Sequence, residues 1–300
     1  MEISKEALIF LDNGSNGSVF LVKISERFYA VKIQKEENHE HEIEIHSKLT
    51  HPSIITFIGN IFIKDIFKTG ILMELAEMTL SDIFSSEVKI RFTSKMIKSL
   101  VSAINYIHNK GIVHGDLGSH NILLSNGYLK IADFGNAQYT NNFISHINKK
   151  RIVQCPPYIA PEIFRGEECN DWTKIDMWSL GIILADIALY SKKKPLLSDL
   201  LDCPHHCTYP FCFHVINIAK ELGLTIYYSD IENPDHIKWY SNEKRYIYHL
   251  YSIRYCEIIN NTNVEYIPIT FLRKRKAFVS NLLVFDPNRR FNAQQILNLF

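Results

Sequence analysis

The pattern of apolar residues changes near Ala76, and this change limits the fold of the chain more than any other feature. Before Ala76 the apolar residues form short runs separated by turn residues, which favours strands. After it they recur at helical spacing over longer stretches, as between Ile90 and Lys110. Strand-rich sequence followed by helix-rich sequence indicates an α+β fold. We therefore predict a small, mainly antiparallel β lobe at residues 1–76 and a larger, mainly helical lobe at 77–300.

Within the first part, residues 8–24 show a strand, a glycine-containing turn and a second strand. Further strands are expected at Phe28–Ile33, Ile54–Phe62, Ile71–Leu75, Val113, Ile122–Leu124 and Leu129–Ala132, and helices at about Glu36–Leu49, Ile90–Lys110 and Met177–Tyr190. The segment from about 191 to 275 follows no simple pattern. We expect two or three helices and an irregular insertion there.

Three segments carry candidate chemistry. The turn Asp12-Asn13-Gly14-Ser15-Asn16-Gly17 precedes a strand containing Lys32, and glycines let backbone N–H groups approach phosphate oxygens. Alone, this is an ordinary turn beside a solvated lysine. In the segment from His114 to Asn121, the carboxylate of Asp116 could accept a proton from a hydroxyl group. The amide oxygen of Asn121 follows five residues later. The third segment, Asp133-Phe134-Gly135, follows a strand and offers the hard oxygen that Mg²⁺ prefers.

In this order, the segments resemble the eukaryotic protein kinase family, and the resemblance covers nearly the whole chain. It implies a two-lobed kinase-like fold in a single domain over residues 1–300, with ATP and Mg²⁺ as cofactors. It assigns Asp116 as the catalytic base. It also implies that Lys32 binds the α- and β-phosphates of ATP and that Asn121 and Asp133 are metal ligands.

The resemblance further selects Glu42, by its spacing from His51-Pro52, as the partner of Lys32, with Glu40 and Glu44 as alternatives. It identifies Met73 as the gatekeeper before a hinge that reads adenine through backbone groups. Val19, Ala30 and Leu123 would enclose the purine. The residues expected to bind the nucleotide are Leu11, Gly14, Gly17, Val19, Ala30, Lys32, Glu42, Glu74, Ala76 and Leu123.

The chain departs from the family pattern at several positions. Asp12 replaces the first glycine of the loop, which should weaken ATP binding unless the carboxylate turns outward. Gly115 replaces an arginine that receives an activation-loop phosphate in many kinases, so control through that contact is not expected. Gly118 replaces a lysine that stabilises the transferred phosphoryl group in serine/threonine kinases. His46 stands where an apolar residue is usual, and we expect it to loosen the active assembly.

Two further positions bear on the reaction. His120 could replace part of the charge lost at Gly118 if its ring were cationic. Cys155 stands where serine/threonine kinases usually have threonine, and the tyrosine-kinase pattern is no closer, so the substrate class leans only toward serine/threonine.

Downstream motifs also match the family and imply structural roles. Ala160-Pro161-Glu162 closes the activation segment, and Glu162 is expected to form a buried ion pair with Arg290. Asp176 is expected to brace the backbone of the catalytic loop.

Composition limits the partners. The chain has 33 Lys and Arg against 32 Asp and Glu, a formal charge of +1, so no global field would attract nucleic acid or an anionic membrane. No signal peptide or membrane span is evident, which favours an intracellular protein in the cytoplasm, with the nucleus as an alternative. We also expect a monomer. Cys203, Cys207, Cys212 and His214 could bind Zn²⁺, but cysteines without a metal are the favoured interpretation.

The sequence therefore predicts an ATP-dependent protein kinase that phosphorylates serine or threonine in a protein substrate. The alternative is a pseudokinase that acts as a nucleotide-binding scaffold. Its support is the set of departures at Asp12, His46, Gly115, Gly118 and Cys155. Against it, each residue needed to contact metal, phosphate or the acceptor proton is present. A small-molecule kinase is disfavoured by the Ala-Pro-Glu segment and by the run from Asp286 to Arg290.

Overall fold

The structure, a computed structural model, describes residues 2–14, 17–35, 40–86, 88–142, 158–160, 162–163, 169–190, 278–279, 281–284 and 286–300. These residues belong to two compact units. The first consists of Met1–His114 and Ser119–Tyr139, and the second of Gly115–Gly118 and Thr140–Phe300. The predicted insertion at 191–275, the Cys/His cluster within it and Cys155 lie outside the described residues.

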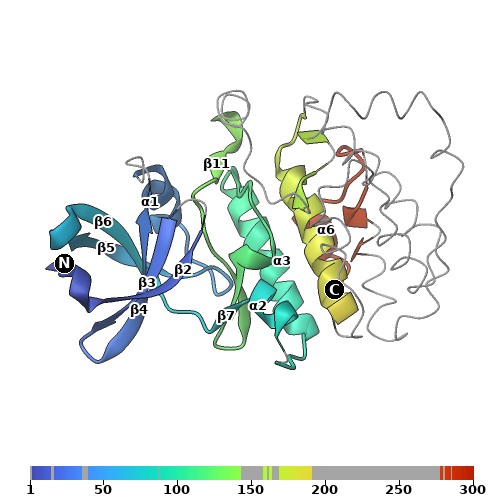
Figure 1. The fold of residues 1–300 in the computed structure, drawn as a ribbon. Helices are drawn as coiled ribbons and strands as arrows, with labels where there is room; N and C mark the ends of the chain where they lie inside the picture. Colours follow the sequence, from blue (N-terminus) through green and yellow to red (C-terminus); the bar gives the residue numbers. More distant parts are fainter. Residues whose placement is uncertain are drawn as a thin grey trace, which may run out of the picture. The chain divides into compact units, whose positions relative to one another are not determined.

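A six-stranded sheet forms the N-terminal part of the first unit, drawn in blue to cyan in Figure 1. Its strands are β1 (Glu2–Ile3), β2 (Leu8–Asn13), β3 (Gly17–Ile24), β4 (Arg27–Gln34), β5 (Phe57–Ile63) and β6 (Lys68–Glu74). Their order in the sheet is β1-β5-β6-β4-β3-β2. The β1–β5 pair is parallel and the other pairs are antiparallel, so the expected mainly antiparallel sheet is confirmed.

Two local features shape the β2–β3 hairpin. Phe10 pairs with Phe20 but Asp12 pairs with Val19, so Leu11 is the extra residue of a bulge. At Gly17, a Cβ atom would lie 2.6 Å from the carbonyl oxygen of Ile33 on β4. A side chain at this position would therefore push β3 away from β4.

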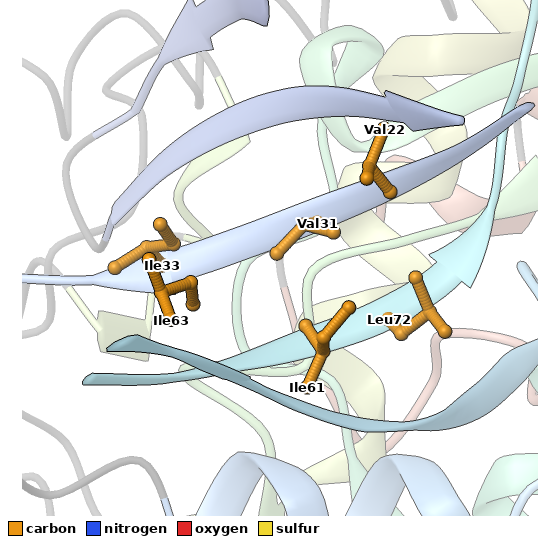
Figure 2. Packing of buried hydrophobic residues seen from close by; sticks show 6 residues of the cluster. All are labelled: Val22, Val31, Ile33, Ile61, Ile63 and Leu72. Carbon is orange, nitrogen blue, oxygen red and sulfur yellow. The ribbon is translucent and has the colours of Figure 1, made fainter. Parts of the chain in front are cut away.

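The core of this sheet is aliphatic. Figure 2 shows Val22, Val31, Ile33, Ile61, Ile63 and Leu72 packed together from neighbouring strands. The period-two spacing of Val31 and Ile33 on β4, and of Ile61 and Ile63 on β5, places each pair on one face of the sheet. This packing fixes the strand that carries Lys32, whose side chain points to the opposite face from Val31 and Ile33.

The rest of the first unit contains short helices and strands. They are η1 (Lys5–Ala7), α1 (Glu40–Ser47), η2 (Lys64–Ile66), β7 (Met78–Thr79), α2 (Leu80–Ser85), α3 (Ser94–Asn109), β8 (Ile112–Val113), η3 (Ser119–Asn121), β9 (Ile122–Ser125), β10 (Tyr128–Ile131) and β11 (Gln138–Tyr139). Helix α3 begins later than its apolar pattern suggested because the side chain of Thr93 accepts a hydrogen bond from Met96 N and caps the helix. Strand β9 pairs with β7 and β10, and β8 pairs with β11.

In the second unit, η4 (Thr140–Asn142), α6 (Thr173–Tyr190) and α12 (Ala293–Leu297) are described. Every residue of α6 from Lys174 to Ala188 is buried, which explains why its sequence is apolar on all sides. Arg290 donates to Glu162 through Nη1 at 2.6 Å and Nη2 at 2.9 Å, and this confirms the expected buried ion pair. The mixture of an antiparallel sheet and helices confirms the α+β class.

Candidate active site

Three charged side chains meet in the first unit around Lys32. Lys32 Nζ lies 2.8 Å from Glu42 Oε1, 2.9 Å from Glu42 Oε2 and 2.7 Å from Asp133 Oδ1. The strand β4, the helix α1 and the segment after β10 each contribute one of these residues. Of the three glutamates considered on α1, the structure brings Glu42 to Lys32.

The pKa values of these three groups reflect burial and the attraction between Lys32 and the two carboxylates. Burial would lower the pKa of Lys32, but Asp133 and Glu42 outweigh it and raise the pKa above its usual value. Burial would likewise raise the pKa of Asp133, but Lys32 lowers it. Burial raises the pKa of Glu42 against the attraction of Lys32, so Asp133 is the carboxylate that we regard as the firmer anionic partner. The raised pKa of Lys32 favours its ammonium form, whose N–H groups are directed at oxygens of Glu42 and Asp133.

Asp133 adopts a backbone conformation that is rare for a residue with a side chain. Its φ is 57°, in the left-handed region. Besides Lys32, its Oδ1 atom accepts a hydrogen bond from Gly135 N at 3.1 Å. These two contacts hold the carboxylate in place, and such strain is typical of functional sites.

The next residue, Phe134, is fully buried between two histidines. Its ring centroid lies 5.1 Å from that of His46 and 5.1 Å from that of His114. That His46 loosens the active assembly stays a prediction, and the structure shows its ring packed against Phe134. His46 is 2 % exposed, and its Nε2 atom lies 2.7 Å from the carbonyl oxygen of Ile55.

The residues expected to enclose adenine form one apolar cluster in the first unit. Ala30 is buried in it with Met73, which is its partner across the β4–β6 pair. Val19, Leu123 and Ala76 pack against the same cluster as partly buried side chains. This arrangement offers an apolar surface next to the Lys32 strand, which suits a purine.

Glu74, the first residue after Met73, uses its side chain for a network that the sequence did not reveal. Its carboxylate accepts from Lys130 Nζ at 2.6 and 2.8 Å, from Ser125 Oγ at 2.6 Å and from the N–H and hydroxyl of Thr56. The sequence signal for this network was a lysine, Lys130, within the apolar run of β10, and the structure shows this lysine to be buried. Any contact of Glu74 with a nucleotide would therefore come from its backbone.

The glycine turn is described except for residues 15 and 16. Gly14 N donates to Gly17 O at 2.9 Å, and Lys35 Nζ donates to Gly14 O at 2.7 Å. Asp12 is exposed and accepts a hydrogen bond from Asn13 N at 2.7 Å. Leu11, at the bulge of β2, is 45 % exposed.

The catalytic-loop residues are divided between the two units. Asp116 is 7 % exposed and belongs to the second unit, where the neighbouring Gly115 N donates to Asp176 Oδ1 at 3.0 Å. This bond confirms that Asp176 braces the loop backbone. Gly115 has a φ of 75°, which glycine adopts without the steric cost that a side chain brings.

Asn121 belongs to the first unit, as Asp133 does. It precedes β9, and its carbonyl oxygen accepts a hydrogen bond from Ala132 N, the residue before Asp133, at 2.9 Å. Ile122 also pairs with Ile131 across β9 and β10. The two expected metal ligands therefore come from adjacent strand ends. One carboxylate and one amide oxygen fit Mg²⁺, which usually completes its shell with water and phosphate oxygens.

His120 does not fit its expected role as a cation. Burial lowers the pKa of this imidazole, which favours the neutral ring. The structure therefore gives no support to a positive charge at His120 in place of the one lost at Gly118.

Comparison with known proteins agrees with the resemblance of the sequence motifs. The family described as "Protein kinase domain" matches residues 8–299. Serine/threonine-protein kinase pakH of Dictyostelium discoideum is 34% identical over 200 residues, which is 62% of this chain and 38% of that protein. The cell cycle serine/threonine-protein kinase CDC5/MSD2 of Saccharomyces cerevisiae is 36% identical over 151 residues, 48% of this chain and 20% of that protein.

A third similar protein is named a dual-specificity kinase. Dual specificity protein kinase shkD of Dictyostelium discoideum is 30% identical over 227 residues, 71% of this chain and 28% of that protein. The matched region thus covers well under half the length of each of these three relatives. In the described part of this chain, no helix is long and apolar enough to cross a membrane.

Proposed function

Because this chain belongs to the protein kinase domain family, we propose that it transfers the γ-phosphate of ATP to serine or threonine hydroxyl groups of a protein substrate. The observation that carries the proposal is the contact of Lys32 with both Glu42 and Asp133. A charged lysine held between two carboxylates is already positioned for phosphate oxygens.

Each site residue has a role that its position supports. Lys32 would donate hydrogen bonds to the α- and β-phosphates. Asn121 and Asp133 would hold Mg²⁺, which neutralises charge on the phosphates when bound. Val19, Ala30 and Leu123 would contact the purine, with backbone groups of Glu74 and Ala76 at its edge.

Asp116 is the group proposed to act on the acceptor. Its carboxylate would accept the proton of the substrate hydroxyl as the oxygen attacks the γ-phosphorus atom, while the bond from that atom to the β-phosphate oxygen breaks and ADP leaves. The bond between Gly115 N and Asp176 fixes the backbone directly before it. Most of the catalytic effect would then come from positioning and from electrostatic stabilisation.

The preference for serine or threonine rests on the names of two relatives, while a third relative is named a dual-specificity kinase. The absence of a lysine at Gly118 favours a slow enzyme, and it is also the main feature in favour of a pseudokinase. Turnover and specificity therefore have to be measured together.

The test is Mg²⁺-dependent transfer of labelled γ-phosphate from ATP to the chain itself and to generic protein substrates. Asp116→Asn is the matched control because it keeps the shape of the side chain and removes the base. We expect label on serine and threonine with the unaltered chain and a large loss with the variant. Label on tyrosine alone would refute the proposed specificity. Equal signals from both proteins would refute the catalytic role of Asp116.

A further inference from the structure

Helix α1 carries Glu42, yet it has little apolar surface with which to hold its own position. It is eight residues long, and its buried residues are Glu42, Ile45 and His46. A helix of two turns is marginal by itself and depends on its contacts with the rest of the protein. Its apolar contacts come from Ile45, which is fully buried, and Ile43, which packs partly buried against the core, so polar contacts also contribute to holding this helix.

Two of these contacts join histidine rings to backbone carbonyl groups. His41 Nε2 lies 2.8 Å from the carbonyl oxygen of Ala137, and His46 Nε2 lies 2.7 Å from that of Ile55. A carbonyl oxygen can only accept, so each Nε2 atom carries the proton. The two histidines lie on either side of Glu42 in the sequence of the helix.

The two acceptors belong to different, well-anchored segments. Ala137 is fully buried and its N–H donates to Phe134 O at 3.0 Å, within the segment that follows Asp133. Ile55 is 1 % exposed and its N–H donates to Ile131 O at 2.9 Å, next to β5. A rotation or slide of α1 would break both bonds at once.

The His46 ring has a second function in this arrangement. It packs against Phe134 at 5.1 Å and against Phe57 at 5.7 Å between ring centroids. Burial lowers the pKa of His46, so a neutral ring with its hydrogen on Nε2 is favoured. Lys32, Asp133 and His114 are the charged or titratable groups that act on this ring. An apolar residue here could fill the same space but could not bind Ile55.

We propose that His41 and His46 are positioning residues that fix α1 through these two carbonyl groups, and so hold Glu42 against Lys32. This inference rests on the proposed phosphate transfer for its kinetic consequences, but its structural part does not. The contact of α1 with the Asp133 segment is then provided by residues of the chain itself.

The experiment compares His46→Leu, which keeps an apolar side chain but removes the donor, with His46→Gln, which keeps an N–H group at similar reach. His41→Leu and His41→Gln form the second pair. Glu44→Gln is the control, because Glu44 is exposed and its ion pair with Lys48, the residue after the end of the helix, is of the kind that contributes little. The glutamine oxygen can still accept the 3.3 Å hydrogen bond that Tyr139 Oη donates to Glu44. Circular dichroism at the assay temperature confirms the folded fraction of each variant.

Two readouts are measured for all variants: amide hydrogen exchange of residues 40–47, with α3 as the internal reference, and kcat and KM for phosphate transfer. For each Leu variant we expect exchange in α1 to rise and kcat to fall. The fall in kcat should be about tenfold for His46→Leu, the effect of losing one buried hydrogen bond, and smaller for His41→Leu, whose hydrogen bond is only partly buried. Exchange in α3 and KM for the protein substrate should stay unchanged. For each Gln variant, kcat should lie within about threefold of the kcat of the unaltered chain.

The outcomes separate the two proposals. If the unaltered chain transfers no phosphate, the proposed function fails, and hydrogen exchange in α1 still tests the positioning. If the Leu variants exchange like the unaltered chain, or if the Gln variants behave like the Leu variants, the positioning proposal is overturned. Faster exchange throughout α3 as well as α1 would also overturn it, because the histidines would then only support general packing.

Discussion

The Nζ atom of Lys32 lies 2.7 Å from Oδ1 of Asp133, across 101 positions of sequence. The same Nζ atom contacts both carboxylate oxygens of Glu42. These contacts join the sheet, the helix α1 and the proposed metal ligand within one compact unit. They are the basis for our proposal that Lys32 couples the nucleotide phosphates to the metal site.

Replacing Lys32 with methionine should therefore reduce phosphate transfer by at least about 100-fold, the usual loss when one preorganised donor is removed. The measurement is the initial rate of transfer at saturating ATP and Mg²⁺. Lys35→Met is the control, because it makes the same chemical change at an exposed lysine whose Nζ atom donates to Gly14 O. It should lower the transfer rate by only a few-fold, about the effect of one weak surface contact. Equal losses in the two variants would contradict the role of Lys32.

The network around Glu74 should make stability depend on pH. Burial would raise the pKa of Glu74, but its bonds from Lys130, Ser125 and Thr56 lower the pKa below 4.5. The carboxylate therefore contributes stability that is present above pH 4.5 and is lost as the pH falls through the folded-state pKa. Relative to the unaltered chain, Glu74→Gln should be less stable at pH 7 by about 1–3 kcal/mol in urea unfolding.

Below pH 4.5 this difference should shrink, because the unfolded chain then binds a proton at Glu74 that the folded chain binds only at lower pH. Lys130→Met provides the matched background. In that background the effect of Glu74→Gln at pH 7 should be smaller, since the strongest partner of the carboxylate is gone. A difference that stays constant from pH 7 to pH 4 would show that Glu74 acts through packing and not through its charge.

Gly115 should resist substitution for a conformational reason. With a φ of 75°, an alanine here would cost about 1–2 kcal/mol, the penalty for a side chain in the left-handed region. The thermal midpoint of Gly115→Ala should fall accordingly. Gly14→Ala is the comparison for stability, because its Cβ atom would have no neighbour closer than 3.6 Å. A midpoint for Gly115→Ala equal to that of Gly14→Ala would contradict this explanation.

Asp12 should have a modest effect on nucleotide affinity. Its carboxylate is exposed and already accepts the Asn13 N–H, so solvent screens its repulsion of ATP. Asp12→Gly should lower the Kd for Mg-ATP by about twofold to fivefold, measured by calorimetry at low salt, because exposed charges contribute little. The gain should decrease as salt is added. A gain that does not depend on salt would point to backbone flexibility as its cause.

Much of the site could be predicted from the sequence because its residues stand in short motifs. The spacing from His51-Pro52 selected Glu42, and the apolar cluster with Val19, Ala30 and Leu123 was expected. The site roles of these residues remain predictions. The two-turn helix α2 was missed, although Thr79 and Asp82 form a capping box that a sequence can reveal.

Contacts between distant residues could not be predicted in the same way. The bonds from Thr56, Ser125 and Lys130 to Glu74 depend on how the strands pair, which no local pattern states. For His46, the sequence showed a polar residue in an apolar position but did not show the carbonyl group of Ile55 that satisfies it. A buried polar residue is destabilising or stabilising according to its partner, so its effect required the structure.

We predict that this chain turns over ATP and does not only bind it. The most direct test compares the unaltered chain with Asp116→Asn in two measurements on the same samples. These are the Kd for Mg-ATP and the rate of γ-phosphate transfer to protein. We predict similar Kd values, turnover near the low end of about 1–100 per second for the unaltered chain, and a rate at least about 100-fold lower for the variant. Tight ATP binding by both proteins, with no transfer by the unaltered chain above that of Asp116→Asn, would contradict catalysis and identify a nucleotide-binding scaffold.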